Sequence, residues 1–202
     1  MTPSLDRIEE GDIAMLSDLH RVVFAGTMGT SLGQGYLRAF FRWFRDYESA
    51  TALVARCDDG SIAGYALGAP HGHGSRVTRD LLPTIVFSVA THPAAWKHPN
   101  FLLQLRTRAL ALLGREPPQT AGPVYGSETY DLVAIGTVPS QRRAGVSSAL
   151  LRELESAARS RGFARIILHV YSDNQPARAF YRRHEYHVAF ETERVVTMEK
   201  GL

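Results

Sequence analysis

The stretch Thr137-Val-Pro-Ser-Gln-Arg-Arg-Ala-Gly-Val-Ser-Ser-Ala-Leu-Leu151 decides the fold of this chain. It follows an apolar run, Leu132-Val-Ala-Ile-Gly136, and it continues into residues with helical spacing, Leu154, Ala157 and Ala158. The apolar run is typical of a strand, and the later spacing is that of an amphipathic helix. The segment therefore predicts a strand, a basic loop with a glycine, and the start of a helix.

The predicted loop has the properties of a phosphate-binding site. The start of a helix presents unpaired backbone N–H groups and the positive end of the helix dipole to an anion. Arg142 and Arg143 add positive charge, and Gly145 lets the backbone approach a phosphate closely. The loop lacks the Lys-Ser/Thr pair of a P-loop and the three glycines of a dinucleotide fingerprint. We therefore expect a pyrophosphate site of another kind.

A second segment lies downstream of this loop. Residues Ile166–Val170 are rich in β-branched side chains and predict a buried strand. Asp173 or Asn174 is expected to cap a helix that has Pro176 in its first turn, where a missing N–H costs little. Tyr181 follows Asn174 by two helical turns.

Together the two segments resemble the GNAT N-acetyltransferase superfamily. Arg142-x-x-Gly145-x-Ser147 is similar to its acyl-CoA signature, Gln/Arg-x-x-Gly-x-Gly/Ala, with a serine that could donate to phosphate in the last place. The closing pattern of strand, Asn, helix and Phe-Tyr is also similar, although Glu185 replaces the usual glycine before the aromatic Tyr186. The motifs cover roughly residues 128–199. The resemblance implies an α/β GNAT acyl-CoA N-acyltransferase fold, a mixed central sheet flanked by helices.

The resemblance also implies acetyl-CoA as acyl donor, with its pantetheine arm between the fourth and fifth strands where they splay apart at a bulge. Backbone groups on the fourth strand would contact the arm and bind the oxyanion, the basic loop would wrap the pyrophosphate, and an asparagine would lie beside the arm. The cofactor-binding residues implied in this way are Ile135, Gly136, Thr137, Arg142, Arg143, Ala144, Gly145, Val146, Ser147, Ser148 and Asn174. For the cluster Arg178, Arg182 and Arg183, contact with CoA phosphates and a solvated helix face both stay open.

For catalysis, the resemblance implies Tyr181 as the general acid for the departing thiolate. Two positions match known places of the general base. Asp131 lies eleven residues before Arg142, and His169 lies five residues before Asn174. A histidine with a pKa of ~6.5 suits this role, whereas an aspartate at ~3.9 needs burial or a relay water. Glu128 or a water relay remains open as well.

Bulk properties agree with a single domain over residues 1–202. No apolar run approaches the ~20 residues of a membrane span, and no signal peptide is expected. A lone cysteine, Cys57, fits a reducing cytoplasm and predicts a small buried side chain. The net charge is only +3 and the basic residues are mostly dispersed, so neither nucleic acid nor membrane is an expected partner.

The rest of the chain predicts mixed α and β structure, with helices, a connector and a hairpin. The expected elements are a strand at Leu5–Ile8, helices at 12–25 and 33–47 joined by a connector at Gly29–Gly35, and hairpin strands at Thr51–Arg56 and Ser61–Leu67.

Residues 70–123 form an expected helical insertion between the third and fourth strands, with helices near 76–90 and 99–113. We expect it to shape the acceptor pocket or a subunit interface, and a homodimer is left open. The His71-Gly-His-Gly74 segment could ligate zinc, but without a nearby carboxylate or cysteine ligand a flexible turn is favoured. No metal is expected.

The predicted function is transfer of an acetyl group from acetyl-CoA to a primary amine of a small molecule, an amino sugar or amino acid-like compound, by direct attack. The loop at Gly26–Gly35 and the insertion would form the acceptor side. The alternatives are a non-catalytic acyl-CoA-binding sensor, and an acetyltransferase that acts on a protein N-terminus or on charged tRNA.

Overall fold

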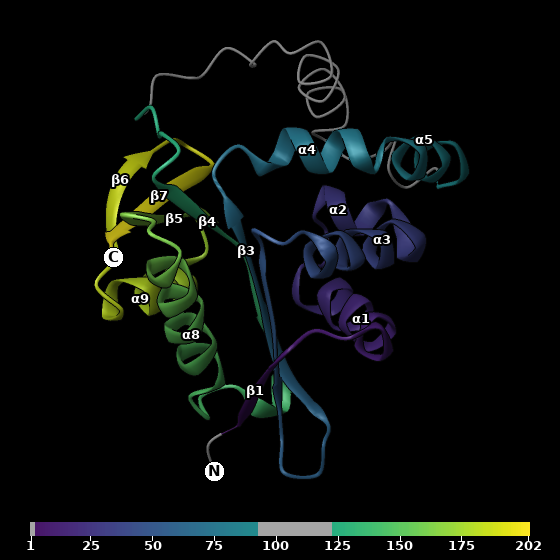
Figure 1. Ribbon diagram of the computed structural model, residues 1–202, viewed down its shortest axis with the longest axis horizontal. Coiled ribbons are helices and arrows are strands. Elements are labelled where there is room, and N and C mark those ends of the chain that lie inside the picture. The colour runs from purple at the N-terminus through teal and green to yellow at the C-terminus, as the bar shows by residue number, and fades with distance from the viewer. Residues whose placement is uncertain (1–2, 93–122) are drawn as a thin grey trace.

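The computed structural model describes residues 3–92 and 123–202 (Figure 1). Its centre is a seven-stranded sheet in the order β1-β2-β3-β4-β5-β7-β6. All neighbouring strands are antiparallel except β4 and β5, which run parallel. The strands are β1 Ser4–Arg7, β2 Thr51–Arg56, β3 Ile62–Pro70, β4 Thr129–Thr137, β5 Arg165–Tyr171, β6 His187–Glu191 and β7 Val195–Gly201. The predicted mixed sheet is confirmed.

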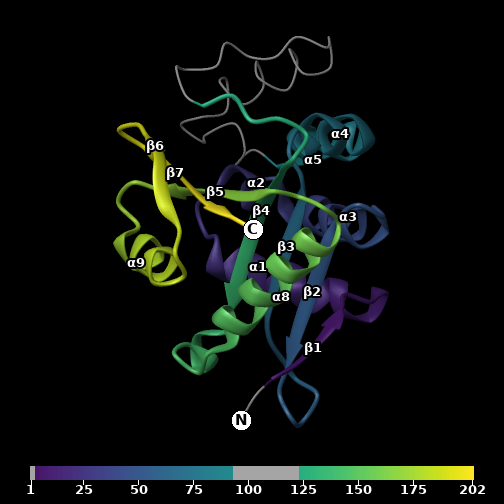
Figure 2. The ribbon, with the colours of Figure 1, turned by 60° about the vertical axis from the view of Figure 1, so that its left-hand side comes forward.

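Helices cover both faces of this sheet (Figure 1, Figure 2). The helices are η1 Glu10–Asp12, α1 Ile13–Val23, α2 Met28–Ser31, α3 Gly33–Asp46, α4 His73–Asp80, α5 Leu82–Thr91, η2 Pro139–Gln141, α8 Val146–Ser160 and α9 Gln175–Arg183. Helices α1 and α3 pack on one face, and α8 and α9 pack on the other. Among the described helices, none is long and apolar enough to span a bilayer.

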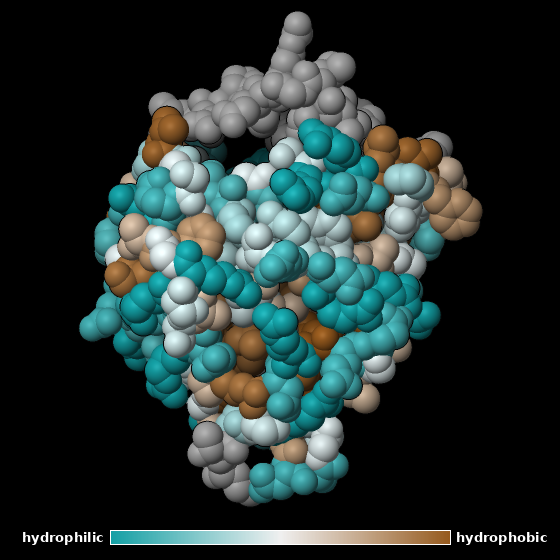
Figure 3. Space-filling view, viewed as in Figure 1, coloured by the Kyte–Doolittle hydropathy of each residue, from teal (hydrophilic) through white to brown (hydrophobic). Residues whose placement is uncertain are grey.

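Each face has its own hydrophobic core. Tyr36, Leu37, Phe41 and Phe44 of α3 are buried, as their helical spacing predicts, and Phe41 meets the ring of Tyr65 edge-on at 5.2 Å. On the other face, α8 buries an apolar stripe against the sheet. The exterior seen in Figure 3 is largely hydrophilic, and apolar side chains gather over α5.

The ladder between β4 and β5 is short. It joins Thr129–Leu132 to Arg165–Leu168 and then stops, while β4 stays paired with β3 as far as Thr137, and β5 stays paired with β7 as far as Tyr171. The β3–β4 register shifts where Leu132 and Ala134 face successive residues of β3, which leaves Val133 as a bulge. The two parallel strands therefore diverge beside a bulge, as the sequence resemblance implies.

Some predicted elements have different boundaries in the structure. The helical stretch expected near 76–90, with a break at Pro83, is two helices, α4 and α5, with Leu81 between them. The break precedes Pro83, which lies in the first turn of α5, where it needs no hydrogen-bond partner. The expected connector at Gly29–Gly35 overlaps the short helix α2. The helix expected at 99–113 lies outside the described residues. Cys57 is only half-buried.

The end of α9 supports a test of backbone strain. Glu185 has a φ of 70°, a left-handed conformation that glycine adopts freely and other residues adopt at a cost. We predict that Glu185→Gly raises the free energy of unfolding by about 1 kcal/mol, or the melting temperature by about 2–4 °C. Denaturant and thermal unfolding measure both quantities.

The control for this prediction is Glu185→Ala. This variant also removes the carboxylate, which lies 3.5 Å from Lys200 Nζ, but it keeps a Cβ at the strained position. It should therefore not stabilise the protein. If both variants shift the unfolding midpoint equally, the backbone conformation is not the cause.

Candidate active site

The start of α8 is built as an anion site. Gly145 precedes the helix with a φ of 84°, and Arg143 also has a positive φ, of 67°. The first backbone hydrogen bond of the helix runs from the Ala149 N–H to the Gly145 carbonyl, at 3.0 Å. The amides of residues 146–148 therefore precede the helical ladder, and they point outward at the positive end of the helix dipole. Arg142 and Arg143 are exposed beside them.

The two serines of this turn have different partners. The Ser147 hydroxyl lies 2.7 Å from Thr137 Oγ1, so it ties the end of β4 to the start of α8 rather than pointing only at solvent. The Ser148 hydroxyl lies 2.9 Å from His184 Nε2, and burial lowers the pKa of His184. No local sequence signal marks His184, because it reaches the loop from the end of α9.

Beyond the point where β4 and β5 diverge, the inner edge of β4 has no strand partner among the described residues. Ile135, Gly136 and Thr137, the expected contacts of the pantetheine arm, lie on this edge. A Cβ on Gly136 would lie 2.6 Å from Cε1 of Tyr65, so the backbone can run here only without a side chain. Tyr65 is itself fixed by a 2.6 Å hydrogen bond to His20, whose pKa burial lowers to about 4.

Helix α9 supplies the expected asparagine and tyrosine. The Asn174 side chain accepts a hydrogen bond from the Ala177 N–H at 3.2 Å, which confirms Asn174 as the helix cap. The Tyr181 ring is buried and packs against Phe180 and Tyr186. Burial raises the pKa of Tyr181 above its usual value, so its hydroxyl keeps its proton at neutral pH.

The arginines of α9 divide into two kinds. Arg178 is buried; its guanidinium donates to the Ser172 carbonyl at 3.1 Å and pairs with Glu191 at 3.0 Å. The solvated face expected from sequence is therefore wrong for Arg178, which ties α9 to β6, and the phosphate contact stays a prediction. Arg182 and Arg183 are exposed.

The opposite face of the sheet holds Asp131. Its neighbours Tyr130 and Leu132 pack into the core under α8, so the Asp131 side chain points away from α8. There Oδ1 lies 3.0 Å from Nδ1 of His71, and Oδ2 lies 3.1 Å from Nδ1 of His73. The chain turns at His71 and Gly72 as predicted, and a carboxylate that the sequence analysis did not place nearby lies beside both rings.

Asp131 is an anion at neutral pH. Burial alone would raise the pKa of its carboxyl, but hydrogen bonds from His71 and His73 outweigh burial and lower it. Nearby on β5, His169 Nδ1 lies 3.0 Å from Thr197 Oγ1. The pKa of His169 is lowered first by loss of solvent around the ring and further by His71 and His73, against an opposing effect of Asp131. His169 is therefore neutral at pH 7.

The structure thus brings Asp131 and His169, the two base candidates, to one face of the sheet, and it adds His71 and His73 to them. Within the described part of the chain, no group of three or more His, Cys, Asp or Glu side chains is arranged to hold a metal ion.

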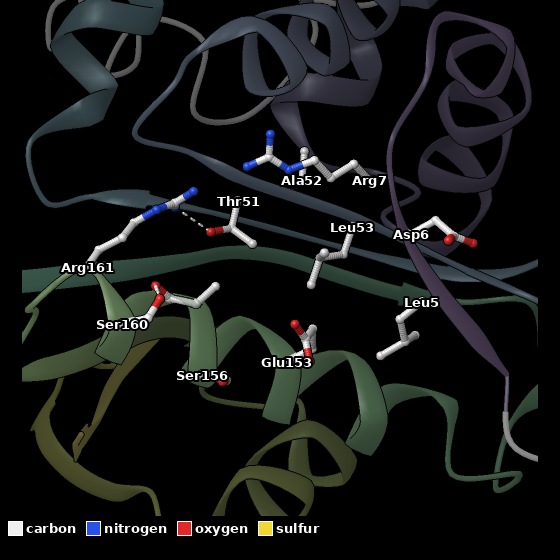
Figure 4. Close-up of a pocket in the computed structure, with 11 residues that line it drawn as sticks. Leu5, Asp6, Arg7, Thr51, Ala52, Leu53, Glu153, Ser156, Ser160 and Arg161 are labelled. Atoms are coloured by element: carbon white, nitrogen blue, oxygen red, sulfur yellow. Dashed lines mark hydrogen bonds between the residues drawn. The ribbon is translucent and has the colours of Figure 1, made fainter.

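A groove of about 380 Å³ lies elsewhere, between the β1–β2 edge of the sheet and α8 (Figure 4). Leu5 and Leu53 lie in it, and Arg161 crosses one end to donate to Thr51 Oγ1 at 2.8 Å. Neither the diverging strands nor the Asp131 cluster lines this groove. It is therefore separate from the candidate active site.

Comparison with known proteins agrees with this geometry. Residues 110–186 match the family model described as "Acetyltransferase (GNAT) family". This part of the chain is thus similar to the acetyltransferases of the GNAT family. With an acetyltransferase domain over these residues, the protein is an acetyl-CoA-dependent acyltransferase. No curated protein matches the chain.

Solved structures show the same fold. A protein called SsHAT is 20% identical, with 100% of this chain and 98% of that chain covered and a TM-score of 0.68. A GCN5-related N-acetyltransferase from Kribbella flavida is 16% identical, with 100% and 98% covered and a TM-score of 0.66. A phosphinothricin acetyltransferase from Sinorhizobium meliloti, in complex with AcCoA, is 14% identical, with 100% and 89% covered and a TM-score of 0.63. At these identities the likeness establishes the fold and not the acceptor.

Proposed function

We propose that this protein transfers the acetyl group of acetyl-CoA to a primary amine of a small molecule by direct attack. The observation that carries the proposal is the divergence of β4 and β5 after Leu132 and Leu168, which opens the sheet between an anion site and a cluster of proton-accepting groups. An acyl donor held in this opening presents its thioester to both faces of the sheet.

The donor would bind on the α8 side. Its pyrophosphate would accept hydrogen bonds from the amides of residues 146–148, with charge from Arg142 and Arg143. Its pantetheine arm would run along the unpaired edge of β4 at Ile135–Thr137, where main-chain groups are available as to an added strand. Asn174 lies at the start of α9, close in sequence to the end of β5.

The acceptor would bind on the face that carries Asp131 and His169. An ammonium group is attracted by the Asp131 carboxylate, and it must lose a proton before its nitrogen can attack. One of the similar structures is named for a small-molecule acceptor, phosphinothricin, which is consistent with an amino acid-like or amino sugar substrate here.

The reaction then follows from the chemistry of thioesters. The neutral amine nitrogen attacks the carbonyl carbon, and the oxygen gains negative charge that an N–H group of β4 can stabilise. The C–S bond breaks as the amide forms. Tyr181, protonated at neutral pH, gives its proton to the leaving thiolate.

The experiment that tests the function measures release of free CoA thiol with acetyl-CoA and three separate amine pools: amino sugars, amino acids and peptides. Release with either of the first two pools supports the proposal. Release with peptides alone would assign a protein N-terminus instead. Binding of acetyl-CoA without release in any pool would make the protein a sensor.

We predict that Gly145→Glu abolishes acetyl-CoA binding measured by calorimetry. A side chain at φ 84° strains the loop, and a carboxylate enters the anion site. Gly162→Glu is the matched control, because Gly162 follows the other end of α8 with a φ of 85° and equally open space around its Cα. It should bind acetyl-CoA normally. Wild-type affinity in Gly145→Glu would show that the loop does not bind the donor.

We predict that Tyr181→Phe lowers kcat by about 10²–10⁴ while the Kd for acetyl-CoA changes little, because the lost proton matters only as charge develops on sulfur. Tyr186→Phe serves as control: this neighbouring buried hydroxyl donates to Glu155 at 3.0 Å, on the side of α8. Its loss should cost stability rather than turnover. Equal kcat in Tyr181→Phe and wild type would mean that the thiolate leaves without this proton.

A further inference from the structure

The Asp131 cluster is assembled by strand pairing. Asp131 lies opposite Ala69 in the β3–β4 ladder, and the His71 N–H extends that ladder to the Thr129 carbonyl at 2.9 Å. Gly72, with a φ of 82°, then turns the chain so that α4 begins with His73. The two histidines therefore reach the same carboxylate from the two sides of one turn.

The carboxylate determines where the imidazole protons lie. An ionised carboxylate can only accept hydrogen bonds, so an imidazole nitrogen that points at it carries the proton. Each oxygen of Asp131 faces one Nδ1, that of His71 in a 3.0 Å hydrogen bond and that of His73 at 3.1 Å, within ion-pair distance. A ring whose Nδ1 proton points at Asp131, as in the hydrogen bond of His71, holds its basic lone pair on Nε2. The His71 and His73 side chains are 32% and 16% exposed, so neither ring is closed off completely from solvent.

We propose that the His71–Asp131–His73 cluster is the general base of the reaction. A histidine of the pair accepts the proton of the acceptor ammonium, and Asp131 is the positioning residue that orients the rings and stabilises the imidazolium. The inference rests on the proposed function, and it names the proton acceptor that this function requires. It also explains why Asp131, with both oxygens engaged, does not need an unusually high pKa.

The proton count closes without another reactant. The ammonium gives one proton to an Nε2 of the pair and becomes the neutral amine. Its nitrogen forms the new C–N bond, the C–S bond breaks, and the thiolate takes a proton from Tyr181. The nitrogen loses its second proton as the neutral amide forms, and an equivalent proton returns the tyrosinate to tyrosine through solvent. The imidazolium then releases its proton to solvent, so that one proton is released overall.

Other charged and titratable groups surround the cluster. His169 faces it from β5, and the Tyr125 ring meets His71 edge-on at 5.7 Å. The Tyr125 hydroxyl donates to Glu199 of β7 at 3.1 Å, and burial together with Glu199 raises the pKa of Tyr125 to about 12. Arg165 lies 4.0 Å from Glu199 and 3.9 Å from Glu128. From α3, the apolar ring of Phe44 packs against His73.

The test is the pH profile of kcat/KM with the amine that releases most CoA in the panel. For wild type we expect the rate to be low in acid, where the pair is protonated, to rise about tenfold per pH unit through a histidine pKa, and then to level off. The double variant His71→Ala/His73→Ala should lose this rise and about 10²–10⁴ of the plateau, and added imidazole should restore part of the rate. The two single variants then identify which ring accepts the proton.

Asp131→Asn tests positioning. An amide can donate to Nδ1, which shifts the proton of the ring to Nε2 and lowers the rate, and the imidazolium loses its counter-charge, so the rise should move to lower pH. A residue that only supports the fold would not move the profile. Calorimetry with acetyl-CoA should give the wild-type Kd in every variant. The control for loss of an imidazole ring is His187→Ala, because the His187 side chain on β6 is 65% exposed and lies outside the cluster.

Two results would overturn the inference. One is a profile that keeps its shape in both the double variant and Asp131→Asn, and the other is a rise that disappears in His169→Ala but stays in the double variant, which would assign the base to His169. Both presuppose a wild-type enzyme that acetylates an amine. Failure of the proposed function is different, because wild type would then release no CoA with any pool.

Discussion

The site depends on where the parallel ladder between β4 and β5 stops. Past Leu132 and Leu168, β4 follows β3 and β5 follows β7, because each has a better antiparallel partner on its outer side. The bulge at Val133 strengthens the divergence and interrupts the alternation of side chains, so that Leu132 joins the core under α8 whereas Ala134 joins the core under α1 and α3. The two hydrophobic cores therefore lie on opposite faces of a sheet in which the β4–β5 ladder is incomplete.

The gap between β4 and β5 gives an acidic group on one face of the sheet and basic groups on the other face access to the same space. Tyr181, buried and protonated, belongs to the α8–α9 face. Asp131 and its two histidines lie on the opposite face, beside α3 and α4. In the proposed mechanism, an acid and a base act on one reacting carbon from opposite faces of the sheet. The two groups are not hydrogen-bonded to each other, so the pKa of each is set by its own surroundings.

Interactions between residues close in sequence made much of the fold and part of the candidate site predictable. The glycine before α8, Gly145, and the cap of α9, Asn174, depend only on residues next to them in the sequence. The hairpin of β2 and β3 likewise follows from its Asp-Gly turn. Counting from the motifs also reached Asp131 and His169. The partners could not be found in this way: His71 is 60 positions from Asp131, and His184 is 36 from Ser148. The acidic partner of Arg178, Glu191, lies on β6, 13 positions further along the chain.

The unpaired stretch of β4 has a consequence for the stability of the folded protein. Main-chain groups at a strand edge are hydrogen-bonded by water or by whatever lies beside them, and such an edge is also where chains stick to one another. On the proposed donor site, the pantetheine arm covers this edge. A ligand at one hundred times its Kd adds about 2.7 kcal/mol to the stability of the folded state. The lifetime of the folded enzyme would then follow the supply of its acyl donor, and scarcity of that donor would expose the edge to self-association.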